Sequence, residues 1–369
     1  MIIERIETTA RFAALGEEWN ALLEISRSKC VFLTFEWLFT WWKHLAGRRK
    51  LFILTSRKEG RLVGILPLVL RPAQYSRMFP RSLEFLGSGL IGSDYLDAIV
   101  MPGVEQEVIE AFSEHLFRAG IVLHLTATRR GASIVAELAT RLCRGGWTTT
   151  DTTINICPYI DLRGQTWETY LSSLGSAQRY NFNRRLKNLQ KDCSLRIEIA
   201  YTPGAAPAAL DAIIGLHHKR WASKEPSQAF QDAQTVAFHR EFVELAAAQR
   251  WLRILVMRID GIPAAALYGL RYGDTFYFYQ SGFDPEWRRQ SLGLVTMGLA
   301  IRSAIEEGVA EFDFLHGREE YKFHWARETR ELGHLELYPH HSRGRLSRRA
   351  VDVNRVMRKM AKRMLGKAA

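Results

Sequence analysis

The feature of this 369-residue chain that most constrains its fold is a series of apolar segments that occurs twice in the same order. Each copy starts with apolar runs separated by a short turn, as in a β-hairpin. A helical pattern that ends at a glycine then precedes one more apolar strand. The copies lie at 51–126 and 252–315. This order predicts an internal duplication of one α/β unit, although hairpins followed by helices are common and the copies share little identity.

The segments of both copies can be placed from their turn residues. In the first copy the apolar runs are 51–55 and 62–70, the helix is 106–119 and the last strand is 121–126. In the second copy the runs are 252–259, 262–272 and 275–283, the helix is 292–307 and the last strand is 311–315. We therefore expect a mixed α/β (α+β) fold of two lobes, each a mixed, mostly antiparallel sheet flanked by helices.

A domain boundary is expected where the chain is rich in turn residues. Gly145-Gly146 and the threonine cluster at 148–153 mark such a place, and the chain length suits two domains of about 150–200 residues. We predict an N-terminal lobe at 1–150, a C-terminal lobe at 151–340 and a basic tail at 341–369.

The positive charge of the chain is concentrated in this tail. It holds ten Lys/Arg and one Asp, a net charge of +9, which leaves +3 of the total +12 for the rest of the chain. A specific nucleic-acid partner is therefore not expected, since it would depend on the tail alone. One stripe of the tail is apolar and consists of Val353, Val356, Met357, Met360 and Met364. Such a helix suits peripheral contact with an anionic membrane or a synthase complex, with a plain terminal extension as the alternative.

Composition predicts a cytoplasmic protein. The basic tail leaves open a peripheral position at the inner membrane. No apolar run reaches the ~18–20 residues of a membrane-spanning helix, and the first residues lack a signal-peptide pattern. The four cysteines are far apart and without histidines at ligand spacing, so we interpret them as reduced thiols and predict no metal site.

A possible anion site lies where the third run of the second copy leads into its helix. A helix start offers free backbone N–H groups, a glycine permits close approach, and two arginines precede them. The residues are Arg288, Arg289, Gln290, Ser291, Leu292 and Gly293. The alternative is an ordinary strand-to-helix turn with a solvated arginine pair.

The segment Gln290-Ser-Leu-Gly293-Leu-Val295 resembles the acyl-CoA pyrophosphate loop of the GNAT superfamily, Gln/Arg-x-x-Gly-x-Gly/Ala, and departs from it at Val295. The wider block from Tyr279 through Phe312-Asp313 to Tyr321-Lys322-x-x-Trp325 is similar to the BioF2-like or CelD/BcsL group of GNAT acetyltransferases, which is linked to bacterial cellulose and exopolysaccharide formation. It resembles FemABX peptidyltransferases more distantly. The similarity spans about residues 5–340.

This resemblance implies two tandem GNAT-like lobes and transfer of an acyl group to an amine or hydroxyl. Acetyl-CoA or another acyl-CoA would be the co-substrate, and the acceptor is unknown. The first copy has acids at 101–107, where a pyrophosphate would need positive potential, so we expect a degenerate N-terminal lobe that does not bind the nucleotide.

Catalytic candidates cluster in 313–325, just after a buried strand. By analogy with GNAT enzymes, Tyr321 is the candidate acid for the leaving thiolate and Lys322 would stabilise negative charge. Glu320 or Asp313 would act as the base. A surface charge or a helix cap is the alternative for each of them.

Acceptor contacts are expected from residues that carry the resemblance outside this cluster. They are Asp94, Tyr95, Arg179, Arg184, Gln280 and Ser281. Arg179 and Arg184 belong to a basic helix at 176–191, which we expect to be capped by Ser176. Its charged face would hold an anionic acceptor or simply be solvated.

Two rival functions remain open. One is a FemABX-like transferase that uses an aminoacyl-tRNA donor, and the other is a catalytically silent accessory protein of an exopolysaccharide or cellulose synthase. A covalent enzyme intermediate is not expected, because the chain has no Gly-x-Ser-x-Gly motif or Cys/His signature.

Overall fold

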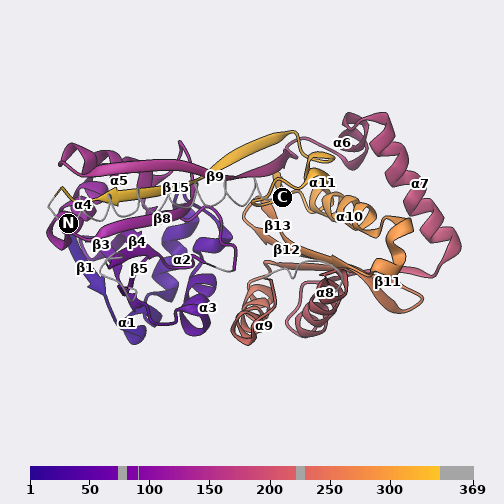
Figure 1. Ribbon diagram of the computed structural model, residues 1–369, viewed down its shortest axis with the longest axis horizontal. Helices are drawn as coiled ribbons and strands as arrows, with labels where there is room; N and C mark the ends of the chain where they lie inside the picture. The colour runs from indigo at the N-terminus through magenta and orange to yellow at the C-terminus, as the bar shows by residue number, and fades with distance from the viewer. Residues whose placement is uncertain (74–80, 90, 222–228, 341–369) are drawn as a thin grey trace, which may run out of the picture.

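Two long strands, β9 (Thr148–Asp161) and β15 (Glu328–Tyr338), run across the molecule and join its two lobes (Figure 1). The computed structural model describes residues 1–73, 81–89, 91–221 and 229–340. Within these ranges an eleven-stranded mixed sheet has the order β10-β11-β12-β13-β14-β9-β15-β8-β6-β5-β2, and a four-stranded sheet has the order β1-β3-β4-β7. The predicted mixed α/β class is confirmed.

The N-terminal lobe is built around both sheets. Its strands are β1 (Ile2–Ile6), β2 (Lys50–Leu51), β3 (Ile53–Lys58), β4 (Arg61–Leu66), β5 (Leu68–Arg71), β6 (Ser82–Phe85), β7 (Ile99–Val100) and β8 (Val122–Arg129). Its helices are α1 (Thr9–Ala13), α2 (Gly16–Ile25), α3 (Phe35–Leu45), α4 (Glu105–Ala119) and α5 (Ile134–Arg144), and a short 3-10 helix, η1 (Val31–Leu33), precedes α3. Thr34 caps α3 by accepting a hydrogen bond from the Trp37 backbone N–H, and this aligns Trp37 and Trp41 on one fully buried face.

The C-terminal lobe places helices on both faces of its part of the large sheet (Figure 1). Its strands are β10 (Leu195–Ala200), β11 (Leu252–Ile259), β12 (Ile262–Tyr272), β13 (Thr275–Phe283) and β14 (Glu311–Asp313). The helices α6 (Trp167–Ser173), α7 (Ser176–Asp192), α10 (Leu292–Glu306) and α11 (Glu320–Phe323) lie toward one face, and α8 (Ala206–Trp221) and α9 (Ala233–Ala248) lie on the other. A 3-10 helix, η2 (Pro285–Gln290), leads into α10.

The strand β15 belongs to both lobes. Leu332–Leu337 pairs with β8 of the N-terminal lobe, and the whole of β15 pairs with β9. The far end of β9 pairs in turn with β14, where Tyr159 lies opposite Asp313. The predicted division near residue 150 thus falls within β9, and it stays a prediction.

The repeated series of segments is present, but the apolar runs 51–55 and 62–70 of the first copy are each split between the two sheets. Both predicted helices form, as α4 ending at Gly120 with a φ of 59° and as α10. The apolar run 62–70, however, is not one strand. Pro67 separates β4 from β5, which join different sheets, because proline has no N–H to donate within a strand.

Two details of the basic helix differ from the prediction. The N-cap of α7 is Gly175, which has no side chain to accept a hydrogen bond, so Ser176 is the first helical residue and not the cap. On the same helix Phe182 is a core residue, whereas Tyr180 is 64% exposed. The helix therefore buries one narrow side only.

Candidate active site

The parallel strands β13 and β14 separate after three residue pairs. They pair from Thr275–Tyr277 and Glu311–Asp313, and then diverge. Strand β13 continues along β12, while the chain after β14 turns to β9, where the Phe314 N–H donates to the Pro158 carbonyl at 2.9 Å. Openings at the carboxyl ends of parallel strands are the usual ligand sites of α/β folds. The opening after Tyr277 and Asp313 is therefore where a ligand site is expected.

A large cavity of about 420 Å³ lies on one side of this opening. The outer part of β13, the start of α10, α7 and α11 form its walls. Its polar lining includes Asn181, Arg185, Arg220, Ser281 and Tyr321, and Gly293 contributes bare backbone. Three residues of α7, at positions 178, 181 and 185, face it because they are one helical turn apart.

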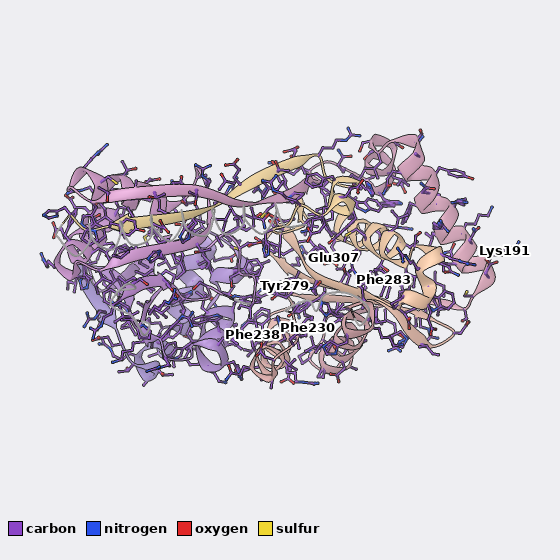
Figure 2. The ribbon with its side chains drawn as sticks, in the orientation of Figure 1. Lys191, Phe230, Phe238, Tyr279, Phe283 and Glu307 are labelled. Atoms are coloured by element: carbon purple, nitrogen blue, oxygen red, sulfur yellow. The ribbon has the colours of Figure 1, made fainter. Side chains whose placement is uncertain are left out.

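A small cavity of about 220 Å³ lies on the other side, toward the N-terminal lobe. Tyr279 and Gln280 of β13 line it together with His239 of α9, and so do His316, Tyr321 and Lys322. Tyr279 lies nearer to the N-terminal lobe than Phe283, which lines the large cavity (Figure 2). Tyr321 borders both cavities, so the two meet at its side chain.

His316 is held by a carboxylate from the other lobe. Its ring Nδ1 lies 2.9 Å and 3.0 Å from the two oxygens of Asp94, and its backbone N–H donates to Asp94 Oδ2 at 2.8 Å. Asp94 is buried, whereas the His316 side chain is 44% exposed and lines the small cavity. The hydrogen bond from His316 to Asp94 and the negative charge of this carboxylate raise the pKa of His316 above its ordinary value. With Nδ1 engaged, Nε2 is the ring nitrogen available for proton transfer.

Lys322 shapes the loop that carries His316. Its buried ammonium donates to the His316 carbonyl at 2.7 Å and lies 3.1 Å from Glu319 Oε2. Gly317 has a φ of 137°, and a Cβ there would lie 2.6 Å from Lys322 Nζ. The loop is thus folded tightly around the lysine, which also lines the small cavity.

Asp313 lies behind the cavities in a buried polar network. It accepts hydrogen bonds from the Tyr95 hydroxyl at 2.7 Å, from Arg330 at 2.9 Å and from the Leu315 N–H at 2.7 Å. Burial raises the pKa of Asp313 to about 7, and the Arg330 charge opposes this rise. Among the residues that the structure describes, neither cavity is lined by Asp313 or by Tyr95. The network fixes the end of β14, and its members Tyr95 and Arg330 line a separate cavity of about 230 Å³.

The residues of the predicted anion loop divide into exposed and buried ones. Arg288 and Arg289 are exposed on η2, and Ser291 and Gly293 line the large cavity. Leu292 is 1% exposed and packs in the core with Leu189, so only its backbone can serve a ligand. Ser291 has a φ of 56° and makes no side-chain cap, which leaves the first N–H groups of α10 directed to the cavity end of the helix.

The remaining predicted residues are dispersed. Gln280 lines the small cavity and Ser281 the large one. Arg179 donates to the Ser172 carbonyl at 3.3 Å, and Arg184 lies over the Tyr180 ring; within the described part of the chain, neither lines the large or the small cavity. Glu320 is exposed at the start of α11 and lines neither cavity among the described residues.

Sequence reasoning did not assign roles to His316, His239, Asn181, Arg185 or Arg220. The signals in the sequence were the position of His316 within the cluster 313–325 and the positions of Asn181 and Arg185 on the predicted basic helix. The pairing of His316 with Asp94 crosses 222 positions, and the fold alone brings them together. His239 is enclosed by aromatic rings that include Phe230 and Phe238 (Figure 2), and burial lowers its pKa to about 3, which keeps it neutral.

Comparisons with known proteins identify similar sequences and folds. Residues 176–323 match a family described as an acetyltransferase (GNAT) domain. No curated protein matches the chain in sequence. Among solved structures, FemX superposes with a TM-score of 0.60 at 10% identity, over 90% of this chain and 97% of FemX. L-PGS from Bacillus licheniformis superposes with a TM-score of 0.52 at 12% identity, over 93% of this chain and 96% of L-PGS.

Residues 176–323 of the C-terminal lobe are thus similar to an acetyltransferase (GNAT) domain, and the chain shares its mixed α/β fold with FemX. The similarity to FemX and L-PGS covers both lobes and concerns the fold. Among the described residues, no helix is long and apolar enough to cross a bilayer.

Proposed function

We propose that this protein transfers an acyl group from acyl-CoA to an amine or hydroxyl, with the reaction centre where the two cavities meet at Tyr321. The single observation that carries the proposal is this meeting point. A ligand in each cavity would present its reactive end to the same tyrosine, beside the exposed ring of His316.

The large cavity suits the acyl-CoA donor. The start of α10 offers backbone N–H groups and the positive end of a helix dipole, both of which favour a pyrophosphate. Arg288 and Arg289 are exposed just before it, and Arg185 lines the cavity itself. The apolar wall from Ala265 to Leu267 suits a pantetheine arm that runs along β12 toward Tyr321.

A bulge in β13 lies where the thioester would arrive. The register of β12 and β13 shifts so that Tyr268 pairs with Gln280 and Gly269 with Phe278, which leaves Tyr279 without an opposite residue. A bulge turns backbone groups out of the ladder. In this proposal the freed N–H groups of β13 stabilise the negative charge that develops on the thioester oxygen.

The chemistry is a direct transfer. The acceptor N–H or O–H gives its proton to His316 Nε2 as its lone pair attacks the thioester carbon. The tetrahedral intermediate collapses, the C–S bond breaks, and the thiolate takes a proton from the Tyr321 hydroxyl. Burial raises the pKa of Tyr321, so the hydroxyl remains protonated before the reaction. Asp94 holds His316 in position. In this assignment His316 replaces Glu320 and Asp313 as the proposed base.

The acceptor site is the small cavity between the lobes, in which Gln280 would orient the acceptor. A polysaccharide or envelope precursor as acceptor depends on the sequence resemblance alone and stays a prediction.

A second donor, an aminoacyl-tRNA as in FemABX-like transferases, is favoured by one observation. The outer face of α7 is basic and exposed, with Arg184, Lys187 and Lys191, and Lys191 lies at the outer end of the helix (Figure 2). A row of cations beside the donor cavity could follow a nucleic-acid backbone.

The test compares donors on the purified protein. Acetyl-CoA at 100 times its Kd stabilises the folded state by about 2.7 kcal/mol, which a thermal shift measures readily. We expect Gly293→Trp to abolish the shift. The Cβ at 293 approaches only Phe283, at 3.8 Å, and Gly293 lines the large cavity, so the indole would occupy space that the donor needs. Gly215→Trp is the matched control, because Gly215 lies on α8 with open space around it.

No shift with acetyl-CoA or free CoA, together with salt-dependent binding of aminoacyl-tRNA that Lys187→Glu weakens, would favour the second donor. A CoA shift that persists in Gly293→Trp would contradict the placement of the donor.

A further inference from the structure

A cluster of two histidines and a glutamate lies in the N-terminal lobe, away from the proposed active site. His124 is on β8, and His334 and Glu336 are on β15. Glu336 pairs directly with His124 and His334 pairs with Thr126, so the three side chains share one face of the sheet. Two strands of a continuous sheet hold them, which makes the cluster rigid.

The distances within the cluster suit one small cation. His334 Nε2 lies 3.1 Å from Glu336 Oε1, and His124 Nδ1 lies 3.8 Å from the same oxygen. All three ligand atoms lie within 4.8 Å of one another. Zinc binds nitrogen and oxygen at about 2.0–2.1 Å, so its tetrahedral ligands are about 3.3–3.4 Å apart. The distances to Glu336 Oε1, 3.1 Å and 3.8 Å, lie on either side of this spacing, and small side-chain rotations would bring the ligand atoms to it.

Neighbouring side chains orient the ligands as in natural metal sites. The Thr126 hydroxyl lies 2.7 Å from His334 Nδ1, so Nε2 is turned toward Glu336. The Tyr338 hydroxyl donates to Glu336 Oε2 at 3.1 Å, which leaves Oε1 facing the two rings. A metal-binding histidine almost always has its second nitrogen engaged in this way.

We propose that His124, His334 and Glu336 bind a divalent metal ion, with zinc the best match. Two imidazoles and one carboxylate form a borderline set of donors that suits zinc, and the fourth position would belong to water. Glu84 lies opposite His124 on β6 but is paired with Arg49 and Arg71, so it is not a ligand.

The bound metal would clamp the last strand of the sheet to the N-terminal lobe. At its other end, β15 carries Arg330, which pairs with Glu311 and Asp313 of the C-terminal lobe. The metal would thus fix one end of β15 to the N-terminal lobe, and the ion pairs of Arg330 would fix the other end to the C-terminal lobe.

The experiment measures metal binding directly and does not depend on acyl transfer. Protein without a histidine tag is treated with a chelator, dialysed, and titrated with zinc by calorimetry. We expect one zinc per chain and a higher thermal midpoint. Thr126→Val should weaken zinc binding about 10–100-fold, since it removes only the orienting hydroxyl. His334→Gln and His124→Gln should weaken it further.

His115→Gln is the matched control, because His115 lies on α4 of the same lobe and outside the cluster. Circular dichroism shows whether each variant is folded, and Glu336→Gln provides a nearly isosteric ligand variant if a histidine variant is not. Absence of stoichiometric zinc binding by the unmodified chain would overturn the proposal. Binding of equal affinity in folded His334→Gln and Glu336→Gln would overturn it as well.

Discussion

At the scale of single residues, the contact between Asp94 and His316 is the most informative feature. It joins the two lobes at the edge of the small cavity and gives a histidine both an orientation and a raised pKa. Asp94 and Tyr95 stand together in the sequence, but Asp94 contacts His316 and Tyr95 contacts Asp313. Two neighbouring residues therefore hold different groups: Asp94 orients His316, and Tyr95 belongs to the buried network of Asp313.

The Asp94–His316 contact predicts a pH effect. His316 must be deprotonated to act as a base, so the rate should rise with pH through its pKa, which Asp94 raises. Asp94→Asn removes the negative charge, so this pKa falls and the rising limb of the kcat profile moves to lower pH. The maximal rate should fall about 10²–10⁴-fold, the usual contribution of a positioned base.

The measurement is the pH dependence of acyl transfer with each variant. An unshifted profile in Asp94→Asn would assign the base elsewhere. Acetyl-CoA binding should be unchanged, because Asp94 does not line the large cavity.

At the scale of elements, α10 combines two glycines with opposite surroundings. A Cβ at Gly298 would lie 2.3 Å from Phe182 Cε2 of α7 and 2.9 Å from Trp325 Cη2. A Cβ at Gly293 would meet nothing closer than 3.8 Å. The first glycine lets α7 and α10 pack closely, and the second leaves space for a ligand.

The two glycines form a matched pair for a stability measurement. Alanine favours a helix over glycine by about 0.5–1 kcal/mol, so Gly293→Ala should preserve or raise stability. Gly298→Ala should instead destabilise by about 1–3 kcal/mol, because overpacking of Phe182 and Trp325 exceeds that gain. Urea unfolding of both variants checks the difference. Equal urea midpoints for the two variants would show that α7 can move away from α10 without a loss of stability.

At the scale of the whole molecule, the shared sheet should couple the lobes. Loss of β15 would remove a partner from both β8 and β9. We expect one unfolding transition, with tryptophan fluorescence and far-UV circular dichroism coinciding. Residues 1–150 alone should fail to fold, because they lack β15 and most of β9. A stable, monomeric fragment 1–150 would contradict this coupling.

The tail at 341–369 lies outside the described residues, and its role stays a prediction from its charge. Each basic residue near an anionic membrane contributes about 1 kcal/mol. We expect the full chain to sediment with vesicles that contain phosphatidylserine and to be released by salt. A chain that ends at residue 340 should not bind them. Equal binding of both chains to the vesicles would show that the tail does not mediate membrane binding.

The sequence by itself determined the strands and helix of the second copy and the helix and last strand of the first, because apolar periodicity and turn glycines act over a few residues. The helices α4 and α10 ended where Gly120 and Gly308 indicated. The block around Gly293 and Tyr321 was also recognisable, since those residues are close in sequence to the motif that they resemble.

Only the tertiary structure decided which side chains meet. Asp313 and Lys322 looked catalytic in the sequence, yet the fold surrounds one with Tyr95 and Arg330 and the other with loop carbonyls. His316 contacts Asp94, and His124 lies beside His334, only because the fold brings together segments that are distant in sequence. Burial and long-range pairing set the chemistry of these groups, and neither is encoded in local pattern.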